Sequence, residues 1–93
     1  MFPYHSFSEM RWCEKRFASR LMQNGIELEG ETHCIDIGAD TTHRPTLFNV
    51  RITISHPDCL GEEWEITRTF HSSDVRLASE WIKRELARKH FTC

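Results

Sequence analysis

The sequence has no long apolar run, and this absence excludes a membrane-spanning helix. No stretch approaches the roughly 18 consecutive apolar residues that such a helix needs. The N-terminal residues show neither a basic start followed by an apolar segment nor a small-residue cleavage site, so we expect no secretory signal. We therefore expect a cytoplasmic protein whose four cysteines are free thiols rather than a disulfide framework.

Glycine is scarce, with four residues in 93, and no glycine-rich phosphate-binding loop is present. A cysteine nucleophile would need a histidine beside it, but His33 and Cys34 are neighbours on an expected strand and point to opposite faces. No second feature places a carboxylate in a dry pocket that would raise its pKa. We therefore expect neither an enzyme nor a cofactor.

An overall excess of basic charge is also lacking. The formal net charge is −2, and residues 26–73 carry three arginines against nine acidic residues, a charge of −6. The segments on either side, 1–25 and 74–93, each carry +2. A polynucleotide binder usually shows a concentrated basic face. This charge distribution therefore favours a partner other than a nucleic acid.

Alternation of apolar and polar residues from Leu47 to Ser55 predicts a strand with one buried face, and Trp64–Phe70 predicts its antiparallel partner. Residues 26–38 alternate with a change of phase near Gly30, which indicates a bend, a bulge, or a loop before a short strand. Residues 39–46 are expected to form a loop. A Ser6–Glu9 capping box and Gly25 predict a helix over 6–23, and a second helix is expected over 74–90.

These elements predict a single α+β domain over residues 1–93. Its order is α-β-β-β-α, with a three-stranded antiparallel sheet and both helices packed on one face. The order and the residues His43–Ile54 resemble a double-stranded-RNA-binding domain, in which a histidine precedes the second strand. The resemblance implies RNA contacts from helix 6–23 and from His43, Arg44 and Arg76. That family opens its last helix with lysines, where this chain has Asp74. RNA binding is therefore the alternative reading.

A repeated His-x-x-Cys pattern provides a further, minor alternative. His56 with Cys59, and His90 with Cys93, could together close a tetrahedral zinc site, because imidazole and thiolate are both good zinc ligands. Six histidines and four cysteines in a short chain also produce such pairs by chance. We therefore expect that these histidines and cysteines bind no metal.

Trp12 lies about half a turn from the apolar stripe of its helix, with Arg16 one turn away, and this pairing is typical of interface hot spots. Alternatively, residues 2–4 fold back over the indole, or the helix rotates to bury it. Acidic residues form the second candidate surface: Glu27, Glu29, Glu31, Glu62, Glu63 and Glu65. They are either a solvated face that discourages edge-to-edge aggregation or a surface for a basic partner.

Together these features predict a small non-catalytic protein-binding module, an inhibitor or adaptor that occludes a larger partner. That partner would have a basic surface and could itself handle nucleic acid. In size and character the chain is similar to phage-encoded inhibitors of host defence such as anti-CRISPR proteins. No shared motif carries that analogy.

Overall fold

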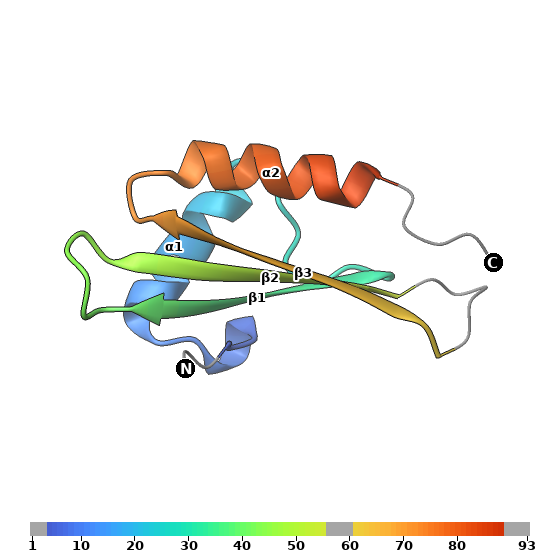
Figure 1. Cartoon of the computed structure of the whole chain (residues 1–93), viewed down its shortest axis with the longest axis horizontal. Coiled ribbons are helices and arrows are strands. Elements are labelled where there is room, and N and C mark those ends of the chain that lie inside the picture. Colours follow the sequence, from blue (N-terminus) through green and yellow to red (C-terminus); the bar gives the residue numbers. More distant parts are fainter. Residues whose placement is uncertain (1–3, 56–60, 89–93) are drawn as a thin grey trace.

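The computed structural model of the chain describes residues 4–55 and 61–88. Figure 1 shows two helices, α1 and α2, and a three-stranded sheet. Along the chain, the three strands follow α1 and precede α2. The bounds of the elements are η1 (Phe7–Glu9), α1 (Trp12–Gln23), β1 (His33–Asp40), β2 (Leu47–Ser55), β3 (Glu63–His71) and α2 (Val75–Ala87). The α+β class and the α-β-β-β-α order are confirmed.

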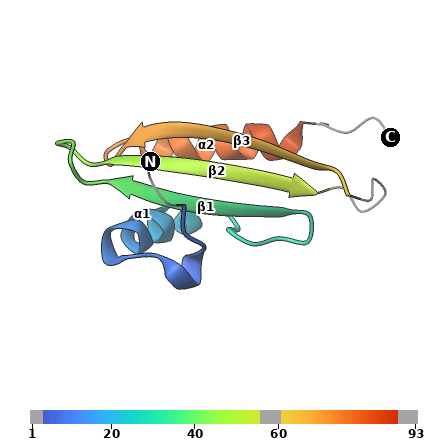
Figure 2. The same cartoon turned by 60° about the horizontal axis from the view of Figure 1, so that its bottom comes forward.

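All neighbouring strands are antiparallel, in the order β1-β2-β3. Ile52 in the middle of β2 lies opposite Ile35 of β1 and Ile66 of β3, so these side chains share one face of the sheet. Both helices cover this face, and Figure 2 shows α1 below β1 and α2 behind β3. The strand Leu47–Ser55 has the bounds that the sequence predicts. We call the other side of the sheet the open face.

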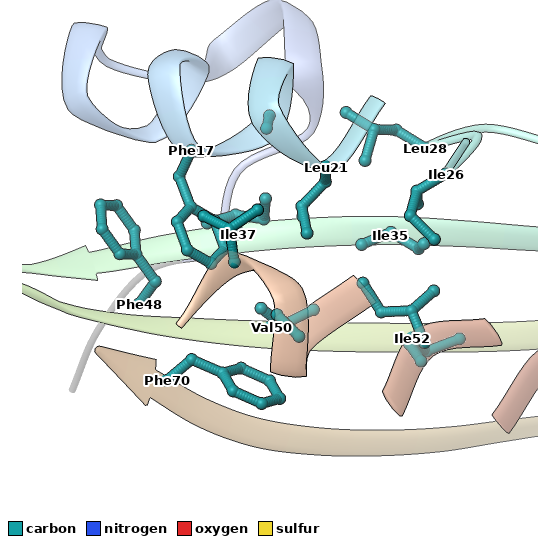
Figure 3. Packing of buried hydrophobic residues seen from close by; sticks show 14 of the residues in the cluster. Phe17, Leu21, Ile26, Leu28, Ile35, Ile37, Phe48, Val50, Ile52 and Phe70 are labelled. Carbon is teal, nitrogen blue, oxygen red and sulfur yellow. The ribbon is translucent and has the colours of Figure 1, made fainter. Parts of the chain in front are cut away.

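Figure 3 shows how the core forms between α1 and the sheet. Phe17 and Leu21 of α1 point toward the strands, and the ring of Phe17 stacks on that of Phe48 at 4.3 Å between centroids. On the same face, Trp81 of α2 packs on Phe70 of β3, with 5.6 Å between the ring centroids. Burial of these large apolar surfaces holds the two helices on one face of the sheet.

The first helix is shorter than expected. The Ser6–Glu9 capping box is present, but it belongs to the separate 3-10 turn η1, and α1 begins only at Trp12. Met10 and Arg11 between them have extended backbone angles. This break lets Met10 enter the core while His5 pairs with the edge of β1. The expectation of one continuous helix over 6–23 was therefore wrong.

Residues 24–32 form a connecting segment rather than a strand. Gly25 ends α1 with a φ of 89°, a left-handed conformation that glycine adopts freely. In the segment, Ile26 and Leu28 are buried while Glu27 and Glu29 are exposed. Strand β1 starts at His33 and continues through residues 39 and 40, which were expected to lie in a loop.

The second helix buries Val75, Ala78, Trp81 and Ile82 against the sheet. Leu77 on the same helix is 56% exposed, whereas the polar residues Ser79 and Glu85 are buried. Ser79 can occupy this position because its hydroxyl donates to the carbonyl of Val75 at 2.8 Å and accepts from the side chain of Asn24 at 3.0 Å. Neither helix of the described part is long and apolar enough to cross a membrane.

Candidate functional site

Carboxylates gather at the end of the sheet where β1 and β3 begin. Cys34, Thr53 and Glu65 form one row across the open face, because they are register partners on three neighbouring strands. The bridge between Glu29 and Cys34 extends this row on the other side. The row therefore has a glutamate at each end.

A shallow hollow of about 350 Å³ lies next to this row, and Glu31 and Glu63 are among its lining residues. Glu62, the chain neighbour of Glu63, is exposed as well. We call the set Glu27, Glu29, Glu31, Glu62, Glu63 and Glu65 the acidic surface. Within residues 4–55 and 61–88, none of the six forms an ion pair. The fold thus places several exposed carboxylates at one end of the sheet, and of these Glu65 interacts electrostatically with Arg51.

An apolar hollow of about 610 Å³ adjoins the acidic surface on the helix side of the molecule. Glu27 and Glu29 lie on its border, and the exposed side chains of Phe7 and Met22 line it with Leu28. The role of Phe7 and Met22 in a surface hollow depends on the break between η1 and α1, which the sequence pattern did not reveal.

The centre of the open face holds an ion pair that the sequence analysis missed. Arg51 donates to the nearly buried carboxylate of Asp36 at 2.8 Å, and its guanidinium lies 4.7 Å from the ring of Tyr4. The pKa of Cys34 is raised by burial and by the adjacent charge of Asp36. A raised pKa lowers the fraction of Cys34 that is present as the nucleophilic thiolate near neutral pH.

Trp12 is 75% exposed, so the alternatives in which its indole is buried do not hold. The guanidinium of Arg16 lies 5.7 Å from the centre of its indole, within the range of a cation–π contact. Both residues line a hollow of about 450 Å³ that also reaches Phe48 near the start of β2. Phe48 and Ser55 are seven positions apart, about 23 Å along β2. The predicted partner-binding residues therefore form two separate surfaces.

The residues proposed for RNA contacts have local partners or stand alone. His43 lies 3.1 Å from Asp40, Arg76 lies 3.5 Å from Glu80, and Arg44 is exposed in the connection between β1 and β2. The pKa of Asp40 is lowered, chiefly by the hydrogen bond from the hydroxyl of Thr42. These residues do not form one cluster.

The four residues of the zinc alternative, His56, Cys59, His90 and Cys93, lie outside the described residues. Within the described ranges, no group of three or more histidine, cysteine, aspartate or glutamate side chains could hold a metal ion. Metal analysis of the purified protein tests the zinc alternative directly.

No protein-family model matches the chain, and neither a curated protein nor a solved structure does. The α-β-β-β-α order with its antiparallel sheet is compatible with a fold like that of double-stranded-RNA-binding domains. The two features of the molecule that could bind a partner are the acidic surface and the hollow beside Trp12.

Proposed function

We propose that this protein is a non-catalytic binding module whose acidic surface binds a basic protein partner. In this role it acts as an inhibitor or adaptor that occludes a larger partner. The observation that carries the proposal is the cluster of six exposed glutamates without an ion pair among the described residues. The apolar hollow at its border supports the same proposal.

Clustered carboxylates repel one another, and a basic partner relieves that repulsion when it binds. The same field accelerates encounter with a basic surface and disfavours acidic competitors. Charge alone gives modest affinity, so a stable complex also needs apolar area at its centre. Phe7 and Met22 provide such area next to Glu27 and Glu29.

Charge reversal in the acidic surface tests the proposal. The double variant Glu62→Lys/Glu63→Lys and the wild-type protein are each used as bait in lysate from the native host, and captured proteins are quantified by mass spectrometry. The control variant is Glu80→Lys, a charge reversal on the exposed side of α2. We expect a basic protein that is captured by the wild type and the control, is lost with the double variant, and is released by added salt.

Circular dichroism of each bait establishes that the fold is retained. If the double variant captures the same proteins in the same amounts as the wild type, the acidic surface is not the binding site. In that case the glutamates serve to protect the edge strand β3, where Glu63 and Glu65 lie, from pairing with other chains.

A degenerate duplex-RNA binder is the second candidate, and one contact favours it. The backbone N–H of Ser72 donates to the carbonyl of Thr46 at 3.0 Å, which joins the β1–β2 connection to the start of α2. Arg20 lines two hollows, one shared with Arg16 and the other with Arg76. A titration with duplex RNA tests this candidate. Binding should weaken steeply with salt, and no binding at low salt eliminates it.

A further inference from the structure

A second hollow of about 450 Å³ lies between α1, the start of β2 and the turn before α2. Figure 1 shows that the β1–β2 connection and the β3–α2 connection lie at the same end of the molecule. We call this hollow the Trp12 groove. Its lining residues are Trp12, Cys13, Arg16, Phe17, Arg20, Thr46, Phe48, Ser72 and Ser73.

The inner side of the Trp12 groove is apolar and rigid. It consists of Cys13 and the stacked rings of Phe17 and Phe48, both of which are almost fully buried in the core. Trp12 stands at the outside with three-quarters of its surface exposed. An apolar side chain that entered the groove would therefore be removed from water. Because the groove is already formed, this binding would not require further ordering of the protein.

The polar lining of the Trp12 groove is basic. Arg16 and Arg20 are one helical turn apart on α1, and neither forms an ion pair with the described residues. Arg20 donates to the carbonyl of Ser72 at 3.4 Å, and this contact holds it across the hollow. No lining residue carries a carboxylate. Two acids follow lining residues along the chain. Glu14, after Cys13, is buried and accepts hydrogen bonds from the backbone of Arg11 and Ala39, and Asp74, after Ser73, is half-buried at the start of α2.

We propose that the Trp12 groove binds an acidic peptide segment of a partner protein, with an apolar side chain of that segment inserted beside Phe48. The two arginines provide the charge complementarity, because each can bind a carboxylate through two parallel hydrogen bonds. Exposed Trp and Arg at one site are the residue types that contribute most binding energy in protein interfaces. The proposal is independent of the acidic surface, which lies at the other end of the sheet.

A peptide fits these observations better than a nucleic acid does. Duplex recognition needs many phosphate contacts along an extended basic face, whereas the groove itself provides two arginines. Asp74 lies at one side, and Arg76 in the neighbouring hollow is already paired with Glu80. A hollow of this size takes one or two side chains, which matches a short peptide.

Selection from a display library of random peptides tests the proposal. The library is selected against the full-length wild-type protein and, in parallel, against the variant Arg16→Glu/Arg20→Glu. We expect the wild type to enrich peptides with an aromatic or aliphatic residue between aspartates or glutamates, and the variant not to enrich them. Enrichment of basic or uncharged peptides, or equal enrichment by both proteins, would overturn the proposal.

The most enriched peptide is then synthesised and titrated by calorimetry. We expect Trp12→Ala and the milder variant Arg16→Gln/Arg20→Gln each to weaken its binding at least about tenfold. The matched controls Leu77→Ala and Arg84→Glu, both on exposed positions of α2, should leave it within about twofold. Circular dichroism confirms the fold of every variant, and the glutamine pair keeps the test valid if charge reversal disturbs α1.

Two further measurements separate this proposal from its neighbours. A duplex RNA of about 16 base pairs that binds more tightly than the peptide, and loses binding in the glutamine variant, would overturn the proposal in favour of nucleic acid. The variant Glu62→Lys/Glu63→Lys should bind the peptide as the wild type does. A loss there would overturn the independence of the two surfaces, whereas failure of the basic-partner capture alone leaves the peptide result standing.

Discussion

Replacement of Glu14 by glutamine should destabilise the protein more than any other conservative change to a charged residue in α1. The side chain of Glu14 is completely buried at the start of this helix. One carboxylate oxygen accepts from the backbone N–H of Arg11 at 2.9 Å and from Nδ1 of His5 at 2.9 Å. The other accepts from the backbone N–H of Ala39 at 2.8 Å. One side chain thus joins the N-terminal segment, α1 and β1.

The size of the effect follows from the hydrogen bonds. A glutamine has one acceptor oxygen, so its NH₂ group must face either the N–H of Arg11 or that of Ala39. A buried N–H left without an acceptor costs about 1–3 kcal/mol, and the remaining bonds lose their charge-assisted strength. We expect Glu14→Gln to lower the free energy of unfolding by about 2–4 kcal/mol. A 93-residue domain typically has about 5–14 kcal/mol in total, so this loss is large.

The effect should also depend on pH. Burial by itself raises the pKa of Glu14, but the hydrogen bonds from Arg11, Ala39 and His5 outweigh it, and the folded-state pKa lies below its ordinary value. A carboxyl group whose pKa is lowered on folding stabilises the protein above its unfolded pKa. That stabilisation is lost as the pH falls through the folded pKa. The difference between wild type and Glu14→Gln should therefore be largest near neutral pH and shrink below about pH 4.

Urea unfolding followed by tryptophan fluorescence at a series of pH values measures both effects. The control is Glu80→Gln, because Glu80 is more than half exposed and its ion pair with Arg76 is on the surface. This control should change the free energy of unfolding by less than about 0.5 kcal/mol. If Glu14→Gln behaves like the control near pH 7, or if its cost does not change with pH, the reasoning about the buried carboxylate is wrong.

Three other changes have expected results. Phe17→Ala should lower the free energy of unfolding by about 3–5 kcal/mol, measured by urea unfolding, because the ring is buried and leaves a cavity. Gly30→Ala should cost about 1–2 kcal/mol in the same assay, because a Cβ at this position would overlap the ring of His33 and displace its hydrogen bond to the carbonyl of Glu27. Asp36→Asn should lower the pKa of Cys34, so iodoacetamide should alkylate that thiol faster at a given pH in a variant without the other cysteines. An unchanged alkylation rate would contradict the electrostatic cause.

The strand Leu47–Ser55 could be predicted from the sequence because its one-sided burial produces a strict alternation. The sequence left it undecided whether Trp12 is exposed or buried. Its position half a turn from the apolar stripe nevertheless indicated the exposed side of the helix, where the residue lies. Local patterns of this kind carry information about the face that a residue occupies. They determined the fold class and the candidate surface residues.

The contacts that could not be predicted connect residues far apart in the sequence. Glu14 bonds to the backbone of Ala39, and Arg51 pairs with Asp36 only because the register of β1 and β2 places them opposite each other. The same carboxylate explains why α1 starts late, since it accepts from the N–H of Arg11 at the first turn. The capping box of Ser6 and Glu9 is present, but the helical segment that it starts ends after one 3-10 turn.

Separation of the two proposed surfaces has a consequence for how a partner is held. The acidic surface and the Trp12 groove have opposite charge and lie about 23 Å apart along β2, beyond the Debye length of about 8 Å at physiological salt. When each site binds a different molecule, a charge reversal at one site should therefore change the binding free energy of that molecule alone. If one partner spans both, its capture should fall far more with either reversal than the binding of an isolated peptide does, because each contact raises the effective concentration of the other. Capture by the two double variants and by their combination, measured in parallel, thus distinguishes one bridging partner from two.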